Sequence, residues 1–106
     1  MICRAGAVTV SELSAGGMAS VLVPFPHAVD DHQTANARVL ADKGAALQLP
    51  QTELSPERLA SLLRSLDRPR LLEMARKARA LGKADAARVV AQRCMELAET
   101  VARRAP

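Results

Sequence analysis

Seven polar side chains near the start of the chain have the chemistry to bind a sugar or a nucleotide. They are Glu12, His27, Asp30, Asp31, His32, Gln33 and Asn36. A carboxylate such as Glu12 can accept hydrogen bonds from both hydroxyls of a ribose, and amides and imidazoles can both donate to and accept from sugar hydroxyls. The cluster is therefore a candidate binding site for a ligand rich in hydroxyl groups.

Several of these residues also have a plain structural interpretation. Glu12 can be an ordinary exposed helix residue, and His27 can fix the loop in which it lies. Asp30 or Asp31 can cap the helix that follows them. Because the two aspartates are adjacent, a paired general acid and base has little support.

Apolar runs alternate with helical segments in the first half of the chain. The Val-rich run 20–25 is continuous, as in a parallel sheet that is covered on both faces, and Pro24 ends it. We expect strands at the opening residues, at 20–25 and at 45–49. We expect one helix over 7–15, ended by Gly16 and Gly17, and a second over 32–43, ended by Gly44. Ligands of open α/β sheets bind beyond the carboxyl ends of the strands. We therefore expect three features at one edge of the sheet: the 4–7 turn, Glu12 and the 27–36 segment. The turn would also offer the free N–H groups of a helix start.

The second half reads as three helices. A serine N-cap, a proline and an acid start the first helix, whose apolar face is formed by Leu59, Leu62, Leu63 and Leu66. Residues 67–69 break it, and a further helix runs to Gly82. Asp85 can cap the last helix, along which runs an apolar stripe of Val90, Cys94, Leu97 and Val101.

This order of elements predicts an α/β fold. We expect three short parallel strands flanked by helices, with right-handed crossovers and a helical C-terminus. Because the chain opens inside a strand, the sequence predicts a partial Rossmann-like domain over 1–106, a piece of a larger doubly wound domain. Residues 1–50 would form its strand and helix region and residues 55–105 its helical region.

Composition narrows the classes of partner. The chain has 106 residues, a net charge of +4 and a single aromatic residue, Phe25. Base stacking on aromatic side chains is therefore unavailable, and we expect no nucleic-acid partner. Residues 1–53 carry three basic and five acidic side chains, whereas the remainder carries twelve and six. The basic half could favour an anionic surface such as a phospholipid leaflet, although a solvated set of Arg-rich helices is the simpler interpretation.

The sequence carries no recognisable metal-binding or targeting motif. Cys3 and Cys94 lie far apart and form neither a zinc motif nor a disulfide framework. We expect reduced thiols, no metal, no cofactor and a cytoplasmic protein. No signal peptide is recognisable, and the longest apolar stretch is too short to span a bilayer.

Two strings carry a family resemblance: CRAGAVTVSELSAGG and VLVPFPHAVDDHQTANA. They resemble the C-terminal half of the MurG family, UDP-N-acetylglucosamine transferases that convert lipid I to lipid II of peptidoglycan. The similarity extends from Met1 to about Leu97, through GAALQLP and LSPERLASLL. It implies a GT-B fold, an inverting transfer without a protein-bound metal, and action of full-length relatives at the cytoplasmic face of the plasma membrane.

The resemblance also implies roles for single residues. Glu12 would bind the ribose hydroxyls of UDP, and the backbone at Ala7 would meet the 4-hydroxyl of the sugar. His32 and Gln33 would contact the hydroxyls of N-acetylglucosamine, with Asn36 beside them. The turn residues Arg4 and Gly6 are further candidates.

The chain departs from the family pattern in what it lacks. The N-terminal domain, with the acceptor site and the candidate catalytic base, has no counterpart here, and neither has the glycine-rich phosphate loop of the C-terminal domain. Ala19 stands where relatives commonly have a proline. We therefore expect a donor-binding half with no catalytic residue of its own, inactive alone, and marginally folded or oligomeric because a sheet edge is left unpaired.

Three functions stay open. The chain can be an enzyme fragment, from a truncated reading frame or paired with a separately encoded N-terminal half. It can be a nucleotide-sugar binding or interaction module without catalysis. It can also be a basic helical module that binds membrane or nucleic acid through its C-terminal helices.

Overall fold

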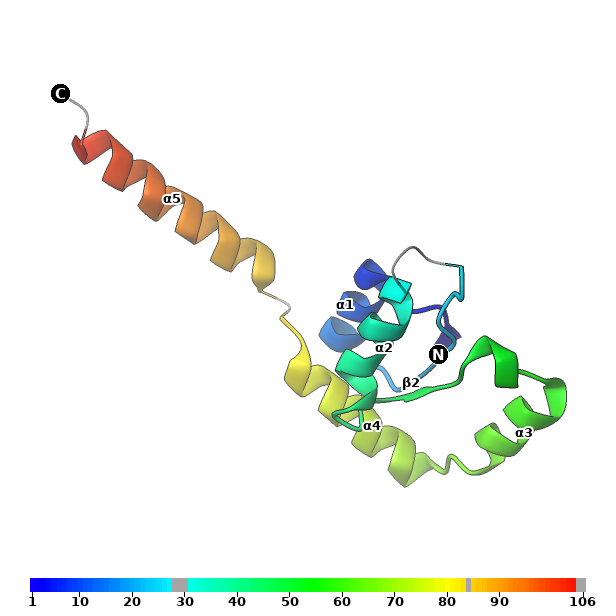
Figure 1. Cartoon of the computed structure of the whole chain (residues 1–106). Helices are drawn as coiled ribbons and strands as arrows, with labels where there is room; N and C mark the ends of the chain where they lie inside the picture. Colours follow the sequence, from blue (N-terminus) through cyan, green and yellow to red (C-terminus); the bar gives the residue numbers. More distant parts are fainter. Residues whose placement is uncertain (28–30, 84, 105–106) are drawn as a thin grey trace.

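A three-stranded parallel sheet forms the centre of the molecule (Figure 1). The computed structural model describes residues 1–27, 31–83 and 85–104. The strands lie in the order β1-β2-β3, with Ile2 opposite Val21 and Ser20 opposite Ala46. Their bounds are β1 Ile2–Cys3, β2 Ser20–Leu22 and β3 Ala46–Gln48, joined by α1 Ala7–Gly16 and α2 His32–Ala41. This arrangement confirms the predicted α/β class with three short parallel strands.

Both faces of the sheet are covered by apolar side chains. Along β2, Leu22 packs into one cluster, while its neighbours Val21 and Val23 belong to the other, as the alternation of a strand requires. The first cluster lies against α1, α2 and α4: Ala5, Val10, Leu13, Leu22, Ala37, Leu40, Ala45, Ala46 and Ala78. The second joins Val21, Val23 and Leu49 to the leucines of the following helical region, Leu59, Leu62 and Leu66.

The two helices after the sheet start at side-chain caps. A short 3-10 turn, η2 (Gln51–Glu53), leads into α3 (Pro56–Arg64) and then α4 (Arg68–Leu81). Ser55 Oγ accepts a hydrogen bond of 3.0 Å from the Arg58 amide, which confirms the predicted N-cap. Asp67 Oδ1 accepts one of 2.9 Å from the Arg70 amide. The residue predicted to lie in a helix break is thus also the cap of α4.

The C-terminal end of α4 packs closely on the C-terminal end of α1. Gly17 ends α1 in the left-handed conformation, with a φ of 62°. A Cβ added to Gly82 would lie 2.5 Å from the Ser14 carbonyl oxygen, so only glycine allows this approach. The guanidinium of Arg79 donates to the Ala15 carbonyl at the same junction.

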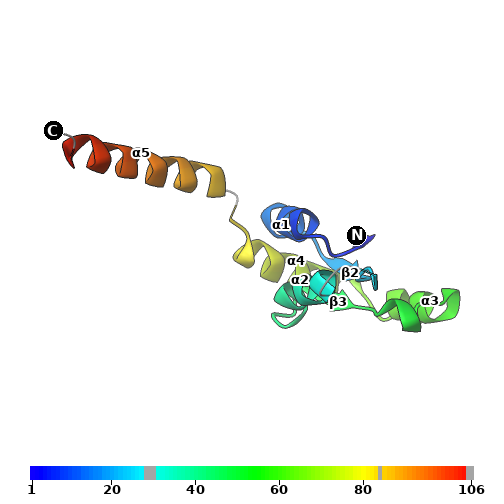
Figure 2. The same ribbon diagram turned by 45° about the horizontal axis from the view of Figure 1, so that its top comes forward.

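The last helix, α5 (Ala86–Arg104), extends away from the rest of the molecule, as both views show (Figures 1 and 2). All of its residues are exposed, including the predicted stripe of Val90, Cys94, Leu97 and Val101. The longest extent of the molecule is therefore 69 Å, against 34 and 17 Å in the other directions. Within the described ranges, no helix combines the length and apolar character needed to cross a bilayer.

Some predicted boundaries were wrong. β2 ends at Leu22, and the Val23 amide makes one further bond of 2.8 Å to the Cys3 carbonyl. The ladder stops there because Pro24 has no N–H to continue it. α2 ends at Ala41, and Gly44, with a φ of 73°, makes the turn into β3. Asp31 occupies the N-cap of α2 but does not cap it: its carboxylate accepts from the Thr34 hydroxyl over 2.6 Å. The alternative cap, Asp30, lies outside the described residues.

Candidate functional site

The turn between β1 and α1 presents backbone N–H groups at the carboxyl edge of the sheet. Ala5 is fully buried, and Gly6 occupies the N-cap of α1. A glycine has no side-chain oxygen, so it cannot accept hydrogen bonds from the amides of the first turn. Ala7, the first residue of α1, is exposed. This helix start can therefore donate N–H groups to an anion or a hydroxyl oxygen.

Glu12 lies on the exposed face of α1 and borders two shallow hollows. The first, of about 400 Å³, is lined by Ala7, Val8, Ser11, Glu12, Ala15 and Lys83. The second, also about 400 Å³, is lined by Met1, Cys3, Thr9, Glu12, Leu13 and Met18. Ala7 and Glu12, two residues predicted to bind the same ligand, thus share one hollow. Lys83 was missed, because no local pattern could place a residue after α4 beside α1.

Two amide side chains of α2 form hydrogen bonds with the backbone of the β1–α1 turn. Gln33 Oε1 accepts hydrogen bonds from the Ala5 amide, 3.2 Å away, and from the Phe25 amide, 2.8 Å away. Asn36 Nδ2 donates to the Ala5 carbonyl over 3.0 Å. The sequence predicted both as ligand groups, whereas the structure shows that each also holds protein backbone. With Oε1 engaged, Gln33 would offer a ligand its Nε2 group, a donor.

Arg4 ties the loops that follow the three strands. Its Nη1 donates to Gln51 Oε1 over 2.6 Å, and to the carbonyls of Val23 and Pro24 over 3.4 Å each. The guanidinium also lies 5.4 Å from the centre of the Phe25 ring, within cation–π range. Arg4, a candidate ligand residue, is thus already engaged with the protein.

His27 lies in the same loop as Phe25. Its ring meets the Phe25 ring edge-on, with 5.5 Å between the centroids. This contact supports the interpretation of His27 as a residue that fixes the loop.

The structure thus groups the predicted residues in two sets, one on the exposed face of α1 and one where α2 meets the β1–α1 turn. Ala7 and Glu12 share a hollow on α1, while Gln33 and Asn36 bind the turn just before it. His32 opens α2 next to Gln33 and is exposed. Within the part of the chain that the structure describes, no three His, Cys, Asp or Glu side chains gather in a way that could hold a metal ion.

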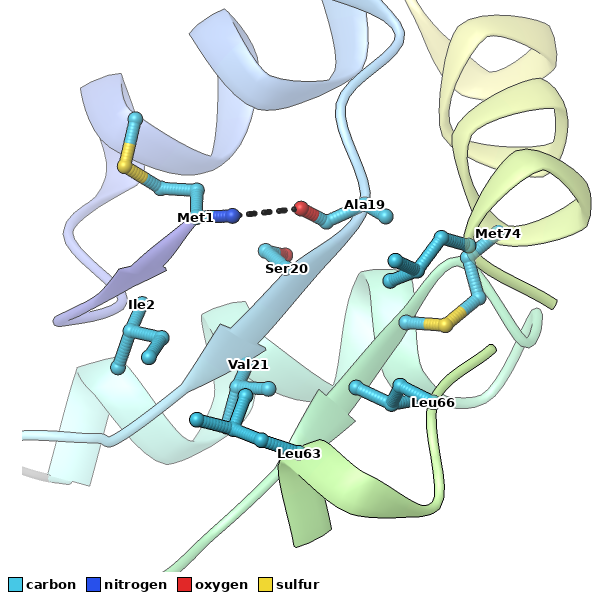
Figure 3. Close-up of a pocket in the computed structure, with 9 residues that line it drawn as sticks. Met1, Ile2, Ala19, Ser20, Val21, Leu63, Leu66 and Met74 are labelled. Carbon is cyan, nitrogen blue, oxygen red and sulfur yellow. Dashed lines mark hydrogen bonds between the residues drawn. The ribbon is translucent and has the colours of Figure 1, made fainter. Parts of the chain in front are cut away.

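An apolar cavity of about 380 Å³ lies at the opposite end of the strands (Figure 3). It is lined by Met1, Ile2, Ala19, Ser20, Val21, Leu63, Leu66, Leu71 and Met74. The Met1 ammonium donates to the Ala19 carbonyl at its rim, and the buried hydroxyl of Ser20 has no partner among the described residues. Because this cavity is apolar and sits at the amino ends of β1 and β2, it does not suit a nucleotide sugar.

Known proteins match the chain along most of its length. The family model of the glycosyltransferase family 28 C-terminal domain matches residues 1–102. A relative from Azoarcus sp. (strain BH72), named UDP-N-acetylglucosamine--N-acetylmuramyl-(pentapeptide) pyrophosphoryl-undecaprenol N-acetylglucosamine transferase, is 66% identical over 93% of the chain. A protein of the same name from Paraburkholderia xenovorans (strain LB400) is 55% identical over all of it.

A solved structure shows the same fold. The crystal structure of Acinetobacter baumannii MurG superposes with a TM-score of 0.82 and 48% sequence identity, over 90% of this chain and 29% of that one. The chain likewise spans 28% of the two curated relatives. The predicted family and the C-terminal GT-B fold are thereby confirmed. The chain belongs to glycosyltransferase family 28, and it matches the C-terminal domain of that family.

Proposed function

We propose that the chain is the UDP-N-acetylglucosamine-binding part of an inverting N-acetylglucosaminyltransferase that converts lipid I to lipid II. The relatives are named as transferases of N-acetylglucosamine to a pyrophosphoryl-undecaprenol acceptor. Because the chain spans 28% of their length, we assign the acceptor site and the catalytic base to the remainder. Residues 1–106 would then be inactive alone, and transfer would also need the N-terminal part that the relatives have, at the cytoplasmic face of the membrane that holds the lipid.

The observation that carries this proposal is the hollow shared by Ala7 and Glu12 at the start of α1. It places a carboxylate one turn and a half from uncapped backbone N–H groups. In our proposal, Glu12 accepts hydrogen bonds from the ribose hydroxyls, and the amide at Ala7 meets the 4-hydroxyl of the sugar. His32 and Gln33 bind further sugar hydroxyls at the same edge, with Asn36 beside them.

In our proposal, the reaction is an inverting transfer of the sugar. The 4-hydroxyl oxygen of the acceptor attacks the anomeric carbon of the donor, the bond from that carbon to the UDP oxygen breaks, and UDP leaves. A base outside residues 1–106 takes the hydroxyl proton. This chain holds and orients the donor, so its residues contribute binding and alignment rather than proton transfer.

Binding of the donor to the isotope-labelled chain tests the proposal. UDP-N-acetylglucosamine should shift amide signals around Ala7, Glu12 and 32–36 in a two-dimensional NMR spectrum. Glu12→Ala should weaken binding about tenfold to a hundredfold, since hydrogen bonds to a charged group contribute about 1.5–3 kcal/mol. Glu99→Ala, which removes an exposed carboxylate from α5, is the matched control. Equal affinity of both variants and the parent would contradict the assigned role of Glu12.

A nucleotide-sugar binding module without catalysis is the second candidate, because the donor-binding residues proposed here would serve it equally well. Both candidates predict donor binding, so transfer activity must separate them. The chain would be mixed with the N-terminal part of a relative, donor and a lipid I acceptor. Formation of the glycosylated lipid supports the enzyme, whereas donor binding without product supports the module.

Binding of the basic helices to an anionic surface is tested by Arg76→Glu with anionic vesicles. Arg76 is the better choice than Arg79, because Arg79 donates to the Ala15 carbonyl and packs at the α1–α4 junction. Vesicle binding that Arg76→Glu abolishes, without any donor binding by the parent, would favour this third function.

A further inference from the structure

The peptide groups of Ala5 are held by side chains from another element. The amide of Ala5 donates to Gln33 Oε1, and its carbonyl accepts from Asn36 Nδ2. Both partners come from the first turns of α2, whereas Ala5 lies in the turn between β1 and α1. Because Ala5 is fully buried, its backbone groups need such partners.

Gln33 binds a second loop with the same atom. Its Oε1 also accepts from the Phe25 amide, which belongs to the loop that follows β2. One side-chain oxygen therefore joins the turn before α1 to the loop after β2, and Asn36 adds a second bond to that turn, the third of the group. Both side chains are half-buried, so water competes less with these bonds than it does at the surface.

We infer that Gln33 and Asn36 are positioning residues, which hold the 4–6 turn and the start of α1 in the geometry that receives the sugar of the donor. This inference rests on the proposed function and changes what these two residues do in it. They act through the backbone of Ala5 and Phe25, in addition to any direct contact of Gln33 with the ligand. We call the three hydrogen bonds of Gln33 and Asn36 to Ala5 and Phe25 the clamp. Its loss should weaken binding of the sugar part of the donor more than binding of the nucleotide part.

The test compares variants that keep or remove single bonds of the clamp. Gln33→Leu removes the acceptor, and Gln33→Glu keeps an oxygen that accepts from both amides. Asn36→Asp replaces the donor by an acceptor that faces the Ala5 carbonyl. Gln92→Leu makes the same change as Gln33→Leu on the exposed α5, where the Gln92 amide donates to Glu96 Oε1 over 3.5 Å.

Two quantities are measured on each variant of the full chain. The first is amide hydrogen exchange at Ala5 and Phe25, with Leu22 in the central strand as the internal reference for folding. The second is the affinity for UDP-N-acetylglucosamine and for UDP, from NMR titrations. Gln33→Leu should speed exchange at Ala5 and Phe25 and lower the affinity for the UDP-sugar about three- to tenfold, with a smaller effect on UDP.

The remaining variants complete the expected pattern. Gln33→Glu should restore slow exchange at both amides and recover most of the lost affinity. Asn36→Asp should weaken binding of the UDP-sugar as Gln33→Leu does, and Gln92→Leu should behave like the parent. Unchanged exchange in Gln33→Leu would overturn the inference. So would a Gln33→Glu variant with slow exchange but the weak affinity of Gln33→Leu, because Gln33 would then act by direct contact through Nε2.

Failure of the proposed function gives a different result. A parent chain that binds neither UDP-N-acetylglucosamine nor UDP overturns the donor site itself, and with it the positioning role toward a sugar. Exchange at Ala5 and Phe25 in Gln33→Leu and Gln33→Glu would still show whether the clamp holds the turn. A general loss of stability is recognised by faster exchange at Leu22 and by equal losses for both ligands.

Discussion

The two thiols of the chain have different surroundings and should react differently. Cys3 lies half-buried in β1, and this burial raises the pKa of its thiol, whereas Cys94 is exposed on α5. Because the thiolate is the reactive form, a raised pKa leaves less of it at pH 8. We expect iodoacetamide to alkylate Cys94 at least about threefold faster than Cys3, as measured by mass spectrometry of the two peptides.

The direction of the pKa shift gives the control for this prediction. Unfolding in urea returns Cys3 to water, so its pKa falls to the ordinary value and its thiolate fraction at pH 8 rises. The two cysteines should then react at similar rates. Equal rates in the folded chain would contradict the burial of Cys3.

At the residue scale, the sequence predicted that Gln33 and Asn36 follow β2 near the β1–α1 turn, but not which groups they contact. The types and spacing of Gln33 and Asn36 were sufficient to place them at the carboxyl edge of the sheet. An amide can bind a sugar hydroxyl or a peptide group equally well, so composition could not reveal the bonds to Ala5 and Phe25. Lys83 reaches the hollow of Glu12 only through the packing of α4 on α1, which is a long-range contact.

The elements themselves were easier to predict, because their signals are local. Ser55 caps α3 as its sequence pattern predicts, and Gly17, one of the two glycines predicted to end α1, caps it in the left-handed conformation. Of the two aspartates predicted to cap α2, Asp31 does not do so, because its carboxylate binds the Thr34 hydroxyl instead of a backbone amide, and Asp30 lies outside the described residues. Local sequence thus identified the helix, while competition between two nearby partners decided the bond.

The cap of α4 can be tested at Asp67. Asp67→Ala removes the acceptor of the Arg70 amide and should lower the free energy of unfolding by about 0.5–2 kcal/mol, measured by urea denaturation. Asp67→Asn keeps a good capping oxygen and should lose clearly less. A pair of variants with equal losses would show that the charge of Asp67, rather than its hydrogen bond, stabilises α4.

The junction of α1 and α4 depends on a glycine. In Gly82→Ala, the new methyl would lie 2.5 Å from the Ser14 carbonyl oxygen and 2.8 Å from its carbon, so one helix end must move. We expect a loss of about 1–3 kcal/mol in the free energy of unfolding. Gly16→Ala is the matched control, because its added Cβ meets no atom within 4 Å and alanine favours a helix. A Gly82→Ala variant as stable as Gly16→Ala would contradict the close approach.

On the scale of the whole molecule, apolar surface is left uncovered at a distance from the sheet. The α5 stripe of Val90, Cys94, Leu97 and Val101 repeats at intervals of four, three and four residues, the spacing of a helix–helix seam. In the structure these side chains are exposed, with Val101 and Leu97 at 68% and 66%. Exposed apolar stripes of this kind drive association in water. We therefore expect the isolated chain to form oligomers through this stripe of α5.

A charge placed on the stripe should dissociate such oligomers. Leu97→Glu would bury a carboxylate against apolar side chains of a second copy, and its cost would favour the monomer by at least tenfold in the association constant. Gln92→Glu adds the same charge outside the stripe and should leave association unchanged. Sedimentation velocity over a range of concentrations measures both. Oligomers that persist in Leu97→Glu would indicate that the copies associate through the edge strand β1 instead of α5. A parent chain that stays monomeric and melts sharply would contradict self-association.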